Sequence, residues 1–215
     1  ISNKHIMGTF FHEHMVHYSY ISACKFLQTK DLQIVNYQRN NIQNGSIIFI
    51  ACHKTYANNS PFLNSSSLID LHKEEQSLGL HSDQWAENFI HKQQQIKADC
   101  LSFLKDENIT SLPGYGAARS GPTLCIQYGL DGFISNLFDD HPSKVDHYSP
   151  YLNMLVEPTR NLNVNDHPYC LILAYIHYKL IIKKNTDYLN SGGQLILLWP
   201  EFTVVNKNNY VSIVK

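Results

Sequence analysis

The feature that most constrains this chain is a glycine-rich turn between two apolar stretches. It reads Gly-Tyr-Gly-Ala-Ala-Arg-Ser-Gly at residues 114–121, follows a long helical pattern, and leads into the start of another helix at Pro122. Glycines at this spacing let a backbone turn sharply and approach a neighbouring element or a phosphate closely. An acidic pair, Asp139 and Asp140, ends the next apolar run. Turn, helix, strand and terminal acid together are typical of half of a Rossmann unit.

The segments around this turn predict an α/β fold. A short strand is expected at 109–112, before the turn, and a helix over 121–128 after it. A strand at 133–138 and a long irregular excursion over 143–168 follow. Residues 170–174 form a continuous apolar run, which is typical of a strand buried on both faces. A helix over 177–189 and a last strand at 194–199 complete the pattern. This alternation implies a mostly parallel, Rossmann-like sheet with right-handed crossovers.

A smaller helix-plus-strand-pair segment precedes this region. The sequence predicts a helix over residues 21–29 and strands at 32–37 and 46–52, with the turn-forming pair Asn44-Gly45 between the strands. One helix and two strands cannot bury both faces of their sheet alone. We therefore expect these strands to join a larger sheet.

The polar residues 54–67 predict a linker between the two parts. Beyond it, helical patterns run over 68–79 and from Ser82 to about Glu107. The expected organisation is a first segment of residues 1–53, the linker, and a Rossmann-like domain of residues 68–215.

Composition excludes several classes of protein. A net charge of −1, from 17 basic and 18 acidic residues, gives no electrostatic basis for nucleic-acid binding. The longest apolar runs, 47–52 and 169–176, are less than half of the roughly 20 residues that a membrane span needs. The chain begins with Ile1, so its natural start is expected upstream. Scattered cysteines without a Cys-x-x-Cys pair predict reduced thiols in a cytoplasmic protein, and they are Cys24, Cys52, Cys100, Cys125 and Cys170.

Histidines gather near the beginning of the chain, around His12-Glu13-His14. One interpretation makes an imidazole a general base, because its pKa lies near neutral pH and an adjacent carboxylate can orient it. A second is a metal site built from His12, His14 and His17. The third is a histidine-rich surface segment. Spacing alone leaves all three open.

Two stretches together resemble one family, the S-adenosylmethionine-dependent sugar C-methyltransferases. Residues 11–14, with Tyr18 and Ser19 after them, resemble its motif Tyr-His-Glu-His…Tyr-Phe-Ser. Residues 114–124 resemble its motif Gly-Tyr-Gly-Ala-x-x-Lys-Gly-Asn-Thr-Leu. Further agreement follows in the same order along the chain, at residues 139–144, 148–150, 171–174 and 192–193.

The resemblance implies methyl transfer from S-adenosylmethionine to a carbon of a nucleotide-linked deoxysugar. Family members carry a zinc-binding domain and a methyl-donor domain before a Rossmann-like C-terminal domain, so the donor site is expected outside this chain, on a partner domain in cis or in trans. The resemblance makes His14 the candidate base and Glu13 its polar partner, and it accounts for His12 and His14 without a metal. The implied substrate-binding residues are Phe11, His12, Gly114, Tyr115, Gly116, Arg119, Gly121 and Asp139.

Departures from the family motifs keep other functions open. Arg119 stands where the family has lysine, which keeps the charge. Phe11 stands where it has tyrosine, Gln43 where it has histidine, and Tyr175-Ile176 where it has Trp-Asn. These changes favour a diverged nucleotide-sugar-binding or structural module without catalysis, in which case the chain is not an enzyme. The glycine turn with Asp139 also fits a dinucleotide-dependent oxidoreductase. The isolated chain, without the donor domain, is expected to be inactive as a methyltransferase.

Overall fold

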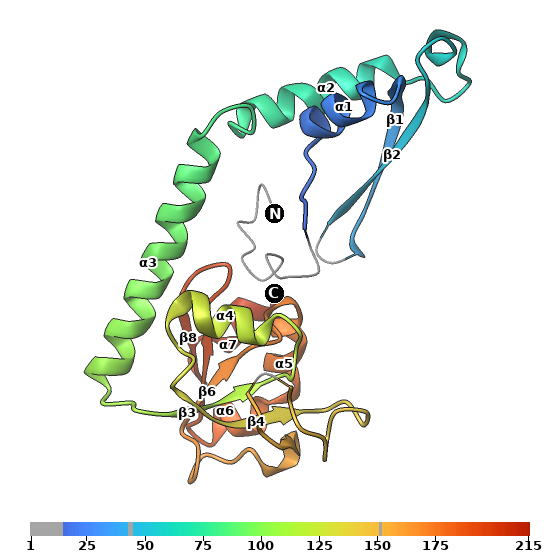
Figure 1. The fold of residues 1–215 in the computed structure, drawn as a ribbon. Helices are drawn as coiled ribbons and strands as arrows, with labels where there is room; N and C mark the ends of the chain where they lie inside the picture. Colours follow the sequence, from blue (N-terminus) through green and yellow to red (C-terminus); the bar gives the residue numbers. More distant parts are fainter. Residues whose placement is uncertain (1–14, 43–44, 151) are drawn as a thin grey trace. The chain divides into compact units, whose positions relative to one another are not determined.

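The computed structural model describes residues 15–42, 45–150 and 152–215 (Figure 1). Within these residues the chain divides into two compact units, one ending at Ile90 and the other starting at His91. The predicted catalytic and sugar-binding residues at positions 11–14 lie outside the described residues.

The N-terminal unit is built on a two-stranded antiparallel sheet. Helix α1 (Tyr20–Gln28) precedes strands β1 (Leu32–Asn40) and β2 (Ser46–His53). Ser19 starts α1 with a reciprocal cap: the Ser19 Oγ accepts from the Ser22 amide at 3.1 Å, and the Ser22 Oγ accepts from the Ser19 amide at 2.8 Å. The register pairs Leu32 with His53 and shifts at a bulge between Ile34 and Asn36.

A buried carboxylate ties the helices of this unit together. Helix α2 (Ser65–Ser77) carries Glu75, whose Oε1 and Oε2 accept from the amides of Tyr20 and Ile21 at 2.5 and 3.0 Å. These are unpaired donors in the first turn of α1, where a negative charge also favours the helix dipole. The small core beneath consists of Ala23, Ile34 and Leu68.

The segment predicted as a linker, residues 54–67, contains the short helix η3 (Ala57–Asn59) and the first residues of α2. Ala57 is buried, and the Asn64 amide donates to the carbonyl of Val35 at 2.9 Å. This segment therefore packs within the N-terminal unit. Helix α3 (Gln84–Asp106) follows, and the boundary between the two compact units falls inside it.

The C-terminal unit contains a six-stranded sheet in the order β5-β4-β3-β6-β7-β8. The first five strands are parallel, and β8 is antiparallel to β7. Counting from β3 as the first strand, this is the order 3-2-1-4-5-6 of the dinucleotide-binding fold. The prediction of a mostly parallel α/β domain is confirmed. The strands are β3 (Leu112–Tyr115), β4 (Ile134–Asp139), β5 (Val156–Pro158), β6 (Tyr169–Ile172), β7 (Gln194–Leu197) and β8 (Thr203–Val205).

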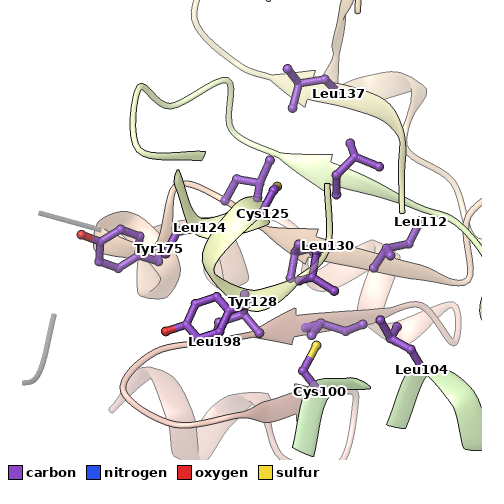
Figure 2. Close-up of a cluster of buried hydrophobic side chains, with 14 of the residues drawn as sticks. Cys100, Leu104, Leu112, Leu124, Cys125, Tyr128, Leu130, Leu137, Tyr175 and Leu198 are labelled. Carbon is purple, nitrogen blue, oxygen red and sulfur yellow. The ribbon is translucent and has the colours of Figure 1, made fainter. Parts of the chain in front are cut away.

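Helices bury both faces of this sheet. On β6, Leu171 belongs to a core cluster that includes residues of α3 and α4 (Gly121–Tyr128), shown in Figure 2. Its neighbours Cys170 and Ile172 belong to a second cluster, with residues of α5 (Tyr178–Lys184) and α6 (Thr186–Asn190). Alternate side chains of a strand point to opposite faces, which explains the continuous apolar run read from the sequence.

Some elements differ from the sequence predictions. The strand expected at 109–112 lies three residues later, as β3, and includes two residues of the glycine motif. The helix expected over 177–189 is divided at Asn185 into α5 and α6. The excursion at 143–168 contains β5 and the short helix η4 (Thr159–Asn161). After the expected last strand the chain adds β8 and α7 (Tyr210–Val214).

Candidate functional site

The candidate site lies where the chain changes direction within the sheet of the C-terminal unit. From β3 the chain continues through α4 to β4 on one side, whereas β6 continues through α5 and α6 to β7 on the other. Ligands of open α/β sheets bind beyond the carboxyl ends of the strands at such a switch point. Here these ends lead into residues 116–120 after β3 and residues 173–177 after β6.

The glycines of the motif allow close packing between these two segments. A Cβ on Gly114 would lie 2.5 Å from Cδ1 of Leu173, and one on Gly116 would lie 2.3 Å from Cβ of Ala174. Gly116 also has a φ of +98°, which side-chain-bearing residues rarely adopt. The space beside these two glycines is therefore filled by the chain itself. A Cβ on Gly121, the first residue of α4, would make only ordinary van der Waals contacts with Leu173, at 3.6 Å.

Asp139 holds the glycine turn from the end of β4. Its Oδ2 accepts from the Ala117 amide at 2.7 Å and from the Lys144 ammonium at 3.0 Å, and its Oδ1 accepts from the His141 amide at 2.8 Å. The residue is only 7% exposed. In a dinucleotide-binding protein the acid at this place would bond a ribose. Here its oxygens are taken by the protein.

Asp140, directly after β4, binds residues of three other elements through a single carboxylate. It accepts from the Tyr115 hydroxyl at 3.2 Å and from the Lys184 ammonium at 2.8 Å, and it also accepts from the Thr159 hydroxyl. Burial pushes the pKa of Asp140 upward, but the hydrogen bonds from Lys184 and Thr159 outweigh it and the net pKa is lowered. Burial raises the pKa of Tyr115 to about 12, so this phenol stays protonated.

A pocket of about 390 Å³ opens beside these two aspartates, at the carboxyl ends of β4 and β5. Asp139, Asp140 and Asp146 face it from one set of loops, and Thr159 and Arg160 face it from η4. Pro142, Val145 and Pro158 complete its lining. Two of its acidic side chains, Asp139 and Asp140, are already paired with Lys144 and Lys184.

The structure therefore brings one group of predicted residues together and says nothing of the other. Six lie at the carboxyl edge of β3 and β4, namely Gly114, Tyr115, Gly116, Arg119, Gly121 and Asp139. The remaining four lie outside the described residues, namely Phe11, His12, Glu13 and His14. Sequence reasoning missed Lys184 and Thr159, which meet Asp140 only through the fold.

Asp140→Asn is expected to destabilise the C-terminal unit at pH 7, because it removes the ion pair with Lys184. The loss should be only about 1 kcal/mol, since this pair is partly exposed and screened by solvent. Since folding lowers the pKa of Asp140, its stabilising effect is complete above its unfolded value of 3.8 and is lost as the pH falls through the lower folded value. Urea unfolding should therefore show a difference between variant and wild type that shrinks below about pH 4.

Asp146→Asn is the matched control, because Asp146 lies on a neighbouring loop and its carboxylate has no hydrogen bond in the described residues. Asp146→Asn should leave the stability unchanged both at pH 7 and below about pH 4. An equal loss of stability in both variants would contradict a specific role for Asp140.

Comparison with known proteins places this arrangement in a family. A family model for the C-methyltransferase C-terminal domain matches residues 41–200, and the chain belongs to that family. The chain is also 22% identical over 201 residues to the C-methyltransferase NovU of Streptomyces niveus. This match covers 92% of the chain and 47% of NovU, so the chain spans about half the length of that relative.

Two further observations concern the described residues only. None of their helices has the length and apolar composition needed to cross a membrane. They also contain no group of three or more His, Cys, Asp or Glu side chains placed to bind a metal ion.

Proposed function

We propose that this chain supplies the C-terminal part of a sugar C-methyltransferase, which moves a methyl group from S-adenosylmethionine to a carbon of a nucleotide-linked deoxysugar. The observation that carries the proposal is the family match over residues 41–200, on a domain with a Rossmann-like sheet. The sugar substrate comes from the resemblance of residues 11–14 and 114–124 to the motifs of such enzymes.

The methyl donor is proposed to bind outside this chain. Leu173 and Ala174 fill the space beside Gly114 and Gly116, and the Asp139 carboxylate already accepts the hydrogen bond of the Ala117 amide. The glycine turn thus lacks the free backbone surface that a cofactor would need. The sequence relative is about twice as long as the matched region, since the match covers 47% of it. A donor domain in the remaining half is consistent with this length.

The substrate-binding role is proposed for the loop between β3 and α4. Arg119 lies on this loop and is exposed, and a guanidinium is well suited to the oxygens of a diphosphate. Two hydrogen bonds fix the shape of the loop: the Tyr115 hydroxyl donates to Asp140, and the Ala117 amide donates to Asp139. In this proposal the glycines act through backbone geometry and close packing.

The chemical step is assigned to the first residues of the chain. Methyl transfer to carbon needs an electron pair on that carbon, so a base must remove its proton. S-adenosylmethionine supplies the electrophilic methyl group. We propose that His14 takes the proton and that Glu13 orients it, as the family resemblance implies.

The N-terminal unit offers a surface for the donor domain. Strand β2 carries Ile47, Ile48, Phe49 and Ile50, and none of its residues is fully buried. A two-stranded sheet is marginally stable alone, and an unpaired apolar edge is a template for another strand. We propose that the donor domain, in cis or in trans, covers this strand. The five cysteines are free, which is consistent with a cytoplasmic location.

Titration calorimetry on the 215-residue chain tests the division of labour. A nucleotide deoxysugar is expected to bind with measurable affinity, whereas S-adenosylmethionine should bind more weakly than about 1 mM, because its site is on another domain. Micromolar binding of S-adenosylmethionine would contradict the domain assignment. Methyl transfer is expected only after the donor domain is supplied. Nucleotide-sugar binding without transfer in any combination would favour a binding module without catalysis.

A further inference from the structure

Tyr175 lies at the switch point of the sheet, on the segment that follows β6. It begins the short helix η5 (Tyr175–His177), directly after the segment in which the amides of Leu173 and Ala174 both donate to the carbonyl of Tyr115, at 2.9 and 3.1 Å. These bonds extend the pairing of β6 with β3. Tyr175 is therefore the first residue after the two central strands part, where a ligand of this fold is expected.

The hydroxyl of Tyr175 is buried and has no hydrogen-bond partner in the described structure. The residue is only 2% exposed. Its neighbour Tyr128 is different, because that hydroxyl donates to Oε1 of Gln93 at 2.5 Å. Figure 2 shows the oxygen ends of both rings pointing away from the aliphatic side chains of the core. An unsatisfied buried polar group costs free energy, so its presence calls for a functional or structural reason.

The surroundings of Tyr175 favour an organic ligand with acceptor oxygens. Trp199, just beyond β7, meets the ring of Tyr175 edge to face at 5.9 Å and that of Tyr178 in the same way at 5.9 Å. Aromatic rings present flat apolar surface together with a few polar atoms, a combination typical of small-molecule sites. Burial raises the pKa of Tyr175 to about 12, so its hydroxyl keeps its proton at neutral pH and can donate it to a hydrogen bond.

We propose that the Tyr175 hydroxyl donates a hydrogen bond to an oxygen of the nucleotide sugar bound at the carboxyl edge of β3 and β6. This inference rests on the proposed function, since it names a substrate contact in the same site. Binding must displace the atoms that cover the hydroxyl, and it relieves the penalty of leaving this donor unpaired. A site built in this way discriminates against ligands that lack the matching acceptor.

The test compares Tyr175→Phe with wild type, because this change removes only the hydroxyl. With dTDP-glucose as the probe in titration calorimetry, the variant should bind about fivefold to tenfold more weakly, the usual effect of one lost hydrogen bond. Its melting temperature should stay the same or rise, since no bond within the protein is lost. Both measurements use the 215-residue chain.

Tyr188→Phe is the matched control. The Tyr188 hydroxyl donates to the carbonyl of His167 at 2.7 Å, in the core cluster of α5 and α6. This variant should melt at a lower temperature and bind dTDP-glucose as wild type does. The contrast separates a hydroxyl that stabilises the fold from one that is kept for a ligand.

Three results would overturn the inference. Equal affinity of wild type and Tyr175→Phe would remove the contact while leaving the proposed function intact. Absence of dTDP-glucose binding to both proteins would count against the inference and the proposed function together. A clear fall in the melting temperature of Tyr175→Phe would show that the hydroxyl is already satisfied inside the protein, for instance by a buried water.

Discussion

Replacement of His14 by alanine is expected to lower kcat for methyl transfer by about 10²–10⁴-fold, the usual contribution of a positioned general base. The proposed reason is that without the imidazole no group removes the proton from the acceptor carbon. Turnover is measured with the donor domain present, either joined to the chain or added to it. Affinity for the nucleotide sugar should change much less than kcat, because the base acts mainly in the transition state.

His91→Ala provides the control for this experiment, because His91 is an exposed residue of α3. It should retain full turnover. Circular dichroism should show the same fold for both variants and wild type. Full turnover in His14→Ala would exclude it as the general base and would return His12 and His17 to consideration.

Replacement of Gly116 by alanine is expected to destabilise the C-terminal unit by about 3 kcal/mol, which corresponds to a fall in Tm of about 12 °C for a unit of this size. The new Cβ would lie 2.3 Å from Cβ of Ala174 and 3.0 Å from its backbone nitrogen. The φ of +98° adds strain of its own. Backbone at this distance cannot move aside without breaking the pairing of β3 with β6.

The C-terminal unit can be followed by the fluorescence of Trp199 in a Trp85→Phe background, since the chain has two tryptophans and Trp85 lies in the N-terminal unit. Gly132→Ala is the matched control. Its Cβ would meet no atom within 4 Å, so the change should be within about 0.5 kcal/mol. Similar stability of the two variants would contradict the packing role assigned to the glycine motif.

Local signals were sufficient where one segment alone sets the structure. Helix α4 begins and ends as predicted, because Pro122 favours the first turn and Gly129 adopts a φ of +72° at the C-cap. Strands β6 and β7 were also recognised, since burial on both faces requires a continuous apolar run. The prediction that Asp139 ends a strand was also correct, because it follows directly on an apolar run.

Strand β3 could not be recognised in the same way. It contains Pro113 and Gly114, both of which are unfavourable in strands. Pro113 is tolerated because the register shifts between Leu112 and Gly114, so no donor is required from it. The identity of this strand depends on its pairing with β4 and β6, which only the assembled sheet provides.

The sequence by itself determined the α/β class, the glycine turn and the family resemblance, because periodicity, turn residues and motifs are local properties. Only the tertiary structure decided what the turn does. Leu173 and Ala174 fill the space beside its glycines, and Lys184 reaches Asp140 across 44 positions of sequence. The unpaired hydroxyl of Tyr175 is likewise visible only after folding, because burial and the absence of a partner in the described residues depend on side chains brought together from distant segments.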